Sequence, residues 1–134
     1  MVTQKYLDEI TYKLIGCAIE ELGPGLLESV YHKCYLNEVY RKGMNYNSQV
    51  YVPINYKSET LDTELRLDVL VEDVIVVELK AVETMHPLYD AQLLTYMKLL
   101  KKPKGLLINF NCTNIFKEGQ KTMVNELYAL LPKQ

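Results

Sequence analysis

A carboxylate and an amine follow the most apolar segment of this sequence. Glu78 and Lys80 come directly after Val74-Ile75-Val76-Val77, a run that is typical of a strand covered on both faces. Because the two residues are two positions apart, their side chains share one face of that strand. Charged groups in such surroundings are costly unless they pair, bind a metal or reach a wet cleft. An ordinary ion pair at the end of a strand is the structural alternative.

A second carboxylate, Asp68, lies on the preceding predicted strand and would approach Glu78 through a hairpin at Glu72-Asp73. If those two residues formed a plain two-residue loop, Asp68 would pair with Val77, and the two carboxylates would point to opposite faces. Both can bind one ion only if the hairpin has an odd loop or a β-bulge, which is a device often found beside active sites. We therefore predict the shifted register.

Two carboxylates beside a lysine favour Mg²⁺ or Mn²⁺, which are hard ions that prefer oxygen ligands. No cluster of histidines or thiols competes for a metal: His32 and His86 stand alone in the sequence, and surface or capping roles suit them. Such an ion could orient a phosphate and lower the pKa of a water, while the lysine offsets charge on the phosphate. The predicted reaction is hydrolysis of a phosphodiester.

The elements that must position these groups follow from periodicity. Helical spacing predicts a helix from about Tyr6 to Leu22 and a second one that has Pro24 in its first turn and reaches about Tyr40. Strands are predicted at about 49–56, 64–71, 74–82 and 105–110, with helices at about 86–100 and 120–131. This αα-βββ-α-β-α order predicts one α/β domain over residues 1–134, with a mixed sheet of about four strands between helices.

The charge distribution is uneven. The formal net charge of −2 excludes a protein that coats nucleic acid by bulk attraction. Residues 94–134, however, contain seven lysines and two glutamates, so the acidic excess lies in the first 93 residues. Six of these lysines could form a phosphate-facing side or simply a solvated face: Lys98, Lys101, Lys102, Lys104, Lys117 and Lys121.

The start of the sequence does not resemble a signal peptide, and no stretch approaches the ~20 apolar residues needed to cross a bilayer. Cys17, Cys34 and Cys112 are odd in number and lack CxxC spacing. We expect buried or half-buried thiols in a reducing compartment, and therefore a cytoplasmic protein that has no membrane partner.

Three motifs resemble those of known nucleases. Asp68 followed by Glu78-x-Lys80 resembles the signature of the PD-(D/E)XK nuclease superfamily. Leu67 stands where that signature has its leading proline, a position that varies within the superfamily. The stretch GLLESVY at 25–31 is the motif that names the GxxExxY family, and QLLTY at 92–96 resembles the QxxxY motif of RecB-like nucleases. The resemblance covers nearly the whole chain.

This resemblance implies a three-layer, restriction-endonuclease-like core and metal-dependent hydrolysis of nucleic acid, with DNA as the expected substrate. Asp68, Glu78 and Lys80 would form the catalytic centre. Glu28 would supply a third carboxylate to the ion, directly or through water. Alternatively, its charge simply suits the N-terminus of a helix.

Gln92 and Tyr96, which share a helix face with Tyr89, would complete the catalytic set. An amide and a phenol there can hold a phosphate or a nucleotide edge, or position Lys80. A polar seam between helix and sheet is the alternative. Two rival functions also fit the sequence: a nucleic-acid-binding module without chemistry, and a protein-interaction domain whose eleven tyrosines form an interface.

Overall fold

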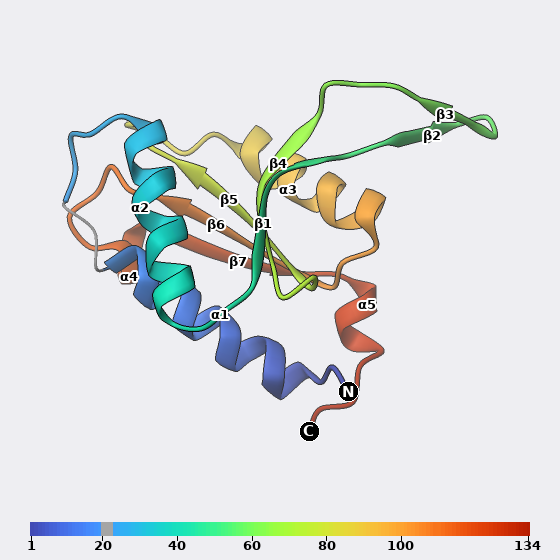
Figure 1. Ribbon diagram of the computed structural model, residues 1–134, viewed down its shortest axis with the longest axis horizontal. Helices are drawn as coiled ribbons and strands as arrows, with labels where there is room; N and C mark the ends of the chain where they lie inside the picture. The colour runs from blue at the N-terminus through green and yellow to red at the C-terminus, as the bar shows by residue number, and fades with distance from the viewer. Residues whose placement is uncertain (20–22) are drawn as a thin grey trace.

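The computed structural model describes residues 1–19 and 23–134, and Figure 1 shows how their elements are arranged. Within these residues a five-stranded sheet has the order β1-β4-β5-β6-β7, and a separate two-stranded sheet pairs β2 with β3. Strands β5 and β6 are parallel, whereas the other neighbours in the large sheet are antiparallel. The strands are β1 (Tyr46–Tyr51), β2 (Ile54–Tyr56), β3 (Glu59–Leu61), β4 (Arg66–Val71), β5 (Ile75–Lys80), β6 (Lys104–Asn109) and β7 (Gln120–Val124).

Helices cover both faces of the large sheet, so the predicted three-layer α/β architecture with a mixed sheet is confirmed. The helices are α1 (Gln4–Ile19), α2 (Glu28–Arg41), α3 (Pro87–Leu100), α4 (Ile115–Glu118) and α5 (Glu126–Ala129). Helices α1 and α2 pack on one face in a core that includes Leu7, Tyr35 and Val77. Helix α3 packs on the other face, where Leu93 and Met97 meet Val76.

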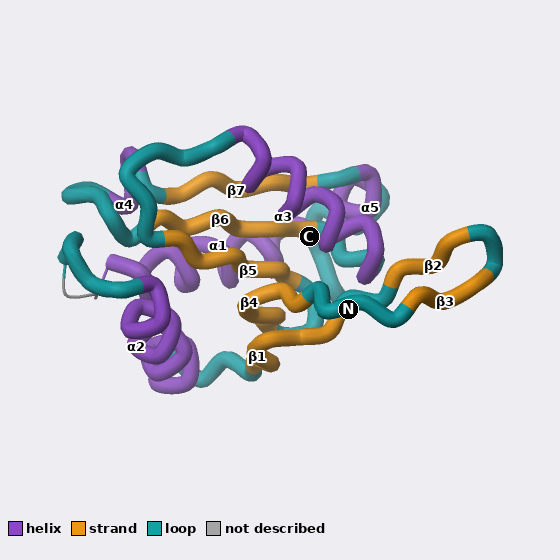
Figure 2. The backbone as a smooth tube through the Cα atoms, turned by 90° about the horizontal axis from the view of Figure 1, so that it is seen from above, coloured by secondary structure: helices purple, strands orange, loops and turns teal. Residues whose placement is uncertain are grey.

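The strand predicted at 49–56 is wrong as a single element. Strand β1 begins at Tyr46 and ends at Tyr51, just before Pro53, whose nitrogen cannot donate to a ladder. Strands β2 and β3 then form a hairpin around Lys57 and Ser58, with φ angles of 50° and 66°. Figures 1 and 2 show this arm extending away from the body of the molecule.

The helix predicted at 120–131 is also wrong. Residues Gln120–Val124 form β7, which pairs antiparallel with β6, and only Glu126–Ala129 are helical. Strand β6 is buried along its whole length, so its backbone on that side needs hydrogen-bond partners that a helix could not supply. Pairing with β7 supplies them and adds a fifth strand to the predicted four.

The start of the second helix differs from the prediction as well. Helix α2 begins at Glu28, so Pro24 lies outside it. Gly23 and Gly25 have φ angles of 86° and 105°, which no right-handed helix contains. The first helix is described as far as Ile19, and its predicted end at Leu22 lies outside the described residues. None of the described helices is long and apolar enough to cross a bilayer.

Candidate active site

The β4–β5 hairpin has the shifted register that the two carboxylates require. Val71 pairs with Ile75 and Val69 with Val77, so the next two residues facing each other are Asp68 and Glu78. The turn at Glu72-Asp73 has φ angles of 51° and 58° and is closed by the Val74 N–H, which donates to the Val71 carbonyl at 3.0 Å. Val74 is thus the extra residue that moves the register by one, which is the register predicted for two carboxylates that share one ion.

The two carboxylates replace the backbone ladder where β4 and β5 stop pairing. The backbone N–H of Asp68 donates to Glu78 Oε1 at 3.1 Å, and the N–H of Leu79 donates to Asp68 Oδ2 at 2.8 Å. Each side chain therefore accepts a hydrogen bond from the strand opposite its own. This exchange holds both carboxylates at one point between the strands.

A backbone irregularity lies on the other side of Asp68. Ser48 pairs with Val69 and Val50 with Leu67, which places Gln49 opposite Asp68. Gln49 has a φ of 52°, a left-handed conformation that is uncommon for a residue other than glycine.

The side-chain alternation of both strands breaks at this point. Tyr46 and Val69 pack with the α1–α2 core, whereas Val50 and Leu67 pack with the α3 core. Regular alternation would keep Val50 on the same face as Tyr46. The sequence offers no signal for this break, because the alternation of Val50, Val52 and Ile54 after Gln49 predicts a regular strand.

Glu78 is buried, with 5% of its surface exposed. Its pKa is raised to about 9, first by burial and then by the negative charge of Asp68, while Lys80 acts in the opposite direction. Burial and the neighbouring carboxylate therefore favour one proton shared within this pair of carboxyls. A cation that binds between the two carboxylates would take the place of that proton.

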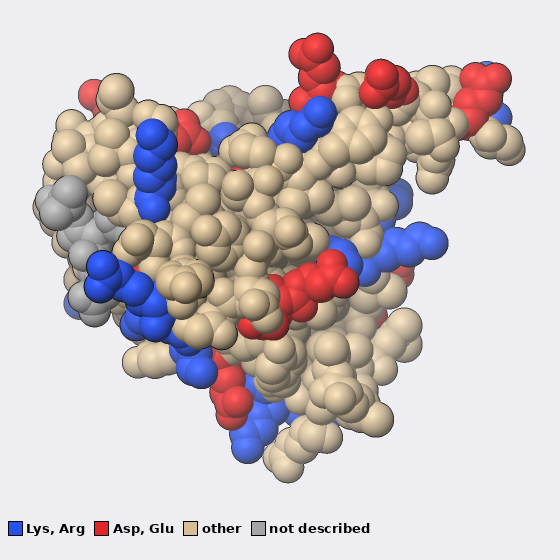
Figure 3. All heavy atoms as spheres, in the orientation of Figure 1, with Lys and Arg blue, Asp and Glu red and all other residues tan. Residues whose placement is uncertain are grey.

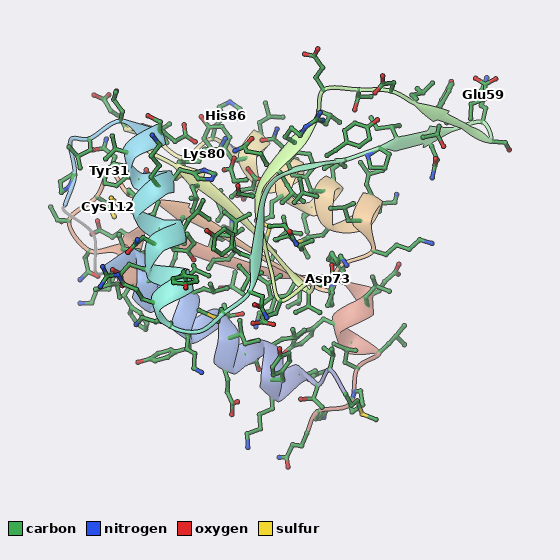
Figure 4. All side chains as sticks on the ribbon, viewed as in Figure 1. Tyr31, Glu59, Asp73, Lys80, His86 and Cys112 are labelled. Atoms are coloured by element: carbon green, nitrogen blue, oxygen red, sulfur yellow. The ribbon has the colours of Figure 1, made fainter. Side chains whose placement is uncertain are left out.

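Lys80 is half-buried at the end of β5, and its Nζ lies 4.7 Å from the centroid of the Tyr89 ring on α3. The aromatic face attracts the ammonium and orients it. In Figure 4, Lys80 lies at the same end of the molecule as His86, and Asp73 marks the opposite end of the β4–β5 hairpin. The capping role suggested for His86 is confirmed: its Nδ1 accepts a hydrogen bond from the Leu88 N–H at 3.0 Å, at the start of α3.

Gln92 and Tyr96 interact on the face of α3 that covers the sheet. Gln92 Nε2 donates to the Tyr96 hydroxyl at 3.0 Å. Tyr96 is buried, and its pKa is raised first by this burial and then by the charge of Glu78. This contact between helix and sheet fits both the catalytic role predicted for the pair and the alternative of a polar seam, and the charges of Glu78 and Asp68 both act on Tyr96.

Tyr31 and Glu28 of the GxxExxY motif have different surroundings. Tyr31 is buried and stacks on Phe110, with ring centroids 4.7 Å apart and planes 5° from parallel. Its hydroxyl donates to the Gly23 carbonyl and accepts from the Leu26 N–H, so Tyr31 fixes the loop before α2. Glu28, by contrast, lies in the first turn of α2 with an exposed side chain. Its pKa is raised first by the part of the carboxyl that is buried, while the charge of Lys80 lowers this pKa and the charge of Asp68 raises it.

The arrangement fits a hard divalent cation at Asp68 and Glu78. Among residues 1–19 and 23–134, no three side chains of the His, Cys, Asp and Glu types are grouped closely enough to hold an ion. Glu28 lines a groove beside Asp68 but does not complete such a group in this structure. Mg²⁺ needs only one or two protein carboxylates, because water and substrate phosphate complete its coordination.

The six C-terminal lysines do not form one phosphate-facing side. Three of them are held in ion pairs: Lys102 with Asp73, Lys104 with Asp8, and Lys121 with Asp90. Lys104 is also buried. Figure 3 shows basic side chains over α2 on the face in view, whereas the β2–β3 arm carries mainly acidic ones.

One of the comparisons with known proteins gives a match. The family model described as the PD-(D/E)XK nuclease superfamily matches residues 8–123, which include Asp68, Glu78 and Lys80. No curated protein and no solved structure matches this chain.

Proposed function

This chain belongs to the PD-(D/E)XK nuclease superfamily, and we propose that it hydrolyses phosphodiester bonds in nucleic acid with Mg²⁺ or Mn²⁺ and that DNA is its substrate. One observation carries the proposal: the bulged hairpin sets Asp68 against Glu78, with Lys80 two residues further along the same strand as Glu78.

We also propose a cytoplasmic setting, since Cys17 is buried and the other two thiols are half-buried.

In this proposal Asp68 and Glu78 hold the divalent cation. A bound cation of this kind polarises a phosphate oxygen and lowers the pKa of a water. Asp68 Oδ2 and Glu78 Oε1 are each oriented by a backbone N–H, so the pair is set before any substrate arrives. Glu28 faces the same site from α2 and would accept a hydrogen bond from a water there.

Lys80 would place its ammonium against a non-bridging phosphate oxygen or against the attacking water. The Tyr89 ring limits the directions that this side chain can take. The Gln92–Tyr96 pair would keep bulk water from the Glu78 side of the site, because Tyr96 is buried against it. Exclusion of water strengthens the electrostatic contacts inside the site.

The direct test is nicking of supercoiled plasmid DNA in Mn²⁺ by the protein and by three variants, Asp68→Asn, Glu78→Gln and Lys80→Ala. Each variant should lose the activity. Glu59→Gln is the matched control, because Glu59 is exposed on β3 and lies at the end of the arm, far from Lys80 in Figure 4. Wild-type rates in all three variants would show that the site is assigned wrongly.

A non-catalytic module that only binds nucleic acid is the second candidate. The small size of the chain and its net charge of −2 favour this candidate, because they leave little surface for binding a duplex. Calorimetry with Mn²⁺ separates the two functions. Heat that depends on Asp68 supports the nuclease, whereas no such heat, together with retained binding of an oligonucleotide, supports the module.

A further inference from the structure

A groove of about 510 Å³ runs between α2 and β1 and ends at Asp68. It is separate from the face of the sheet where α3 presents Tyr89, Gln92 and Tyr96. Its polar lining comes from two elements, α2 with Glu28, Ser29, His32 and Lys33, and β1 with Ser48 and Gln49.

The lining has the chemistry of a phosphate and sugar contact. One wall offers an imidazole, an ammonium and a hydroxyl, and the other offers a hydroxyl and an amide. Side chains of these types make most protein contacts to the nucleic-acid backbone. No aromatic ring other than the imidazole of His32 lines the groove, so it lacks the platform on which bases stack.

The donors of the groove are available to a ligand. Lys33, Ser48 and Gln49 are exposed, and within the part of the chain that the structure describes their side chains have no hydrogen-bond or ion-pair partner. The C-terminal lysines are different, since Lys102 and Lys104 are already paired with carboxylates. Lys33 on α2 therefore supplies a cation to the groove that Asp68 also lines.

The kink at Gln49 decides which way the β1 wall faces. Gln49 lies opposite Asp68 in the register, and its φ of 52° interrupts the strand at that position. Residues on either side of it pack on opposite faces of the sheet, as Tyr46 and Val50 show. The Gln49 amide is thereby presented in the groove beside Asp68. Strained backbone of this kind is concentrated at ligand-binding positions.

We propose that this groove binds the sugar–phosphate backbone of the substrate strand on one side of the scissile phosphate, with Lys33 contacting a phosphate and Gln49 positioning the strand beside Asp68. The inference rests on the proposed function and adds the path of the substrate to it. Recognition through backbone contacts predicts binding that is independent of base sequence. Glu28 and Asp68 lie in the same groove, so binding needs a divalent cation to offset their charge.

The test is fluorescence anisotropy with a labelled oligonucleotide of mixed sequence in Ca²⁺. Lys33→Gln should weaken binding about three- to tenfold and reduce the slope of log affinity against log salt by about one. Gln49→Asn keeps a residue that tolerates left-handed φ but shortens the amide, and it should weaken binding with an unchanged salt slope. Lys98→Gln is the matched control, because Lys98 is exposed on α3, which covers the opposite face of the sheet.

A small diester, bis(4-nitrophenyl) phosphate, separates this inference from the proposed function, because it is too short to occupy the groove and the catalytic site together. Groove variants that lose oligonucleotide affinity while retaining diester hydrolysis support the inference. Groove variants that bind the oligonucleotide as tightly as the wild type, or that lose no more affinity than Lys98→Gln, overturn the inference. Diester hydrolysis by the same protein would still support the nuclease. No diester hydrolysis, together with weaker oligonucleotide binding by the groove variants, overturns the nuclease and leaves the groove as a binding site.

Discussion

Asp68 and Glu78 face each other across the β4–β5 hairpin because one residue, Val74, shifts the register. Without that shift the two carboxylates would lie on opposite faces of the sheet. Instead, each carboxylate accepts a hydrogen bond from a backbone N–H on the strand that carries the other carboxylate. The candidate metal site is therefore a consequence of the geometry of a turn.

Removal of either carboxylate should abolish Mn²⁺ binding and hydrolysis together. Asp68→Asn keeps the size of the side chain but loses the charge, and we expect the rate to fall about a hundredfold or more, since a polarising cation contributes several kcal/mol to the transition state. Calorimetry and plasmid nicking measure the two effects. A variant that loses nicking while binding Mn²⁺ normally would contradict Asp68 as a ligand.

The Glu78 carboxyl should make the cation-free protein less stable as pH rises. Its pKa is about 9 in the folded protein and near 4.5 in the unfolded chain, so the stabilising contribution is complete below about pH 4.5 and is lost as the pH rises toward 9. In that window the free energy of unfolding should fall by on the order of 1 kcal/mol per pH unit. Urea denaturation with a chelator present measures this slope, and Glu78→Gln should remove it.

Lys80 should depend on the Tyr89 ring for its orientation. Tyr89→Phe keeps the aromatic face and should leave hydrolysis nearly unchanged. Tyr89→Leu removes that face and should lower the rate about two- to fivefold, the equivalent of an exposed cation–π contact. Equal rates in the two variants would mean that the 4.7 Å contact does not position the lysine.

The ion pair between Asp8 and Lys104 should matter for stability and not for chemistry. The Lys104 side chain is 5% exposed and lies 2.5 Å from Asp8, so Asp8→Asn leaves a buried ammonium without its counter-charge. We expect a loss of about 1–3 kcal/mol in the free energy of unfolding, measured by urea denaturation at neutral pH. Glu9→Gln is the control, since the Glu9–Lys5 pair is exposed and should contribute less than about 1 kcal/mol.

The Asp8–Lys104 pair should depend on pH in the opposite direction to Glu78. Burial alone would raise the pKa of Asp8, but hydrogen bonds from Lys104 and Tyr128 together with the lysine charge lower it. Its stabilising contribution is therefore present above the ordinary pKa of an aspartate and is lost as the pH falls through the lowered value. A difference between Asp8→Asn and the wild type that persisted in strong acid would contradict this account.

The Tyr31 hydroxyl should stabilise the loop that precedes Glu28. Tyr31→Phe retains the stacking on Phe110 but leaves the Gly23 carbonyl and the Leu26 N–H without this partner. We expect a loss of about 1–2 kcal/mol in the free energy of unfolding. Tyr40→Phe, which alters an exposed tyrosine on the same helix, should change nothing.

Several features were predictable because they are local. The Val74–Val77 run predicted a buried strand, and the two-residue spacing predicted that Glu78 and Lys80 share a face. The extra residue in the hairpin was predicted from the hypothesis that Asp68 and Glu78 share one ion, since only the shifted register brings them together. Local capping chemistry likewise predicted the role of His86.

Other features were decided only by the tertiary structure. The residues at 120–124 became a strand because buried β6 needed a partner, and Lys104 became a buried ion-pair partner because Asp8 on α1 lies beside it. The kink at Gln49 lies opposite Asp68 on another strand, and the raised pKa of Glu78 comes first from burial, which depends on the elements that cover the sheet. Periodicity shows which face of a segment is apolar, but it does not show which other segment will cover that face. Hydrogen-bond pairing and desolvation both depend on the covering segment.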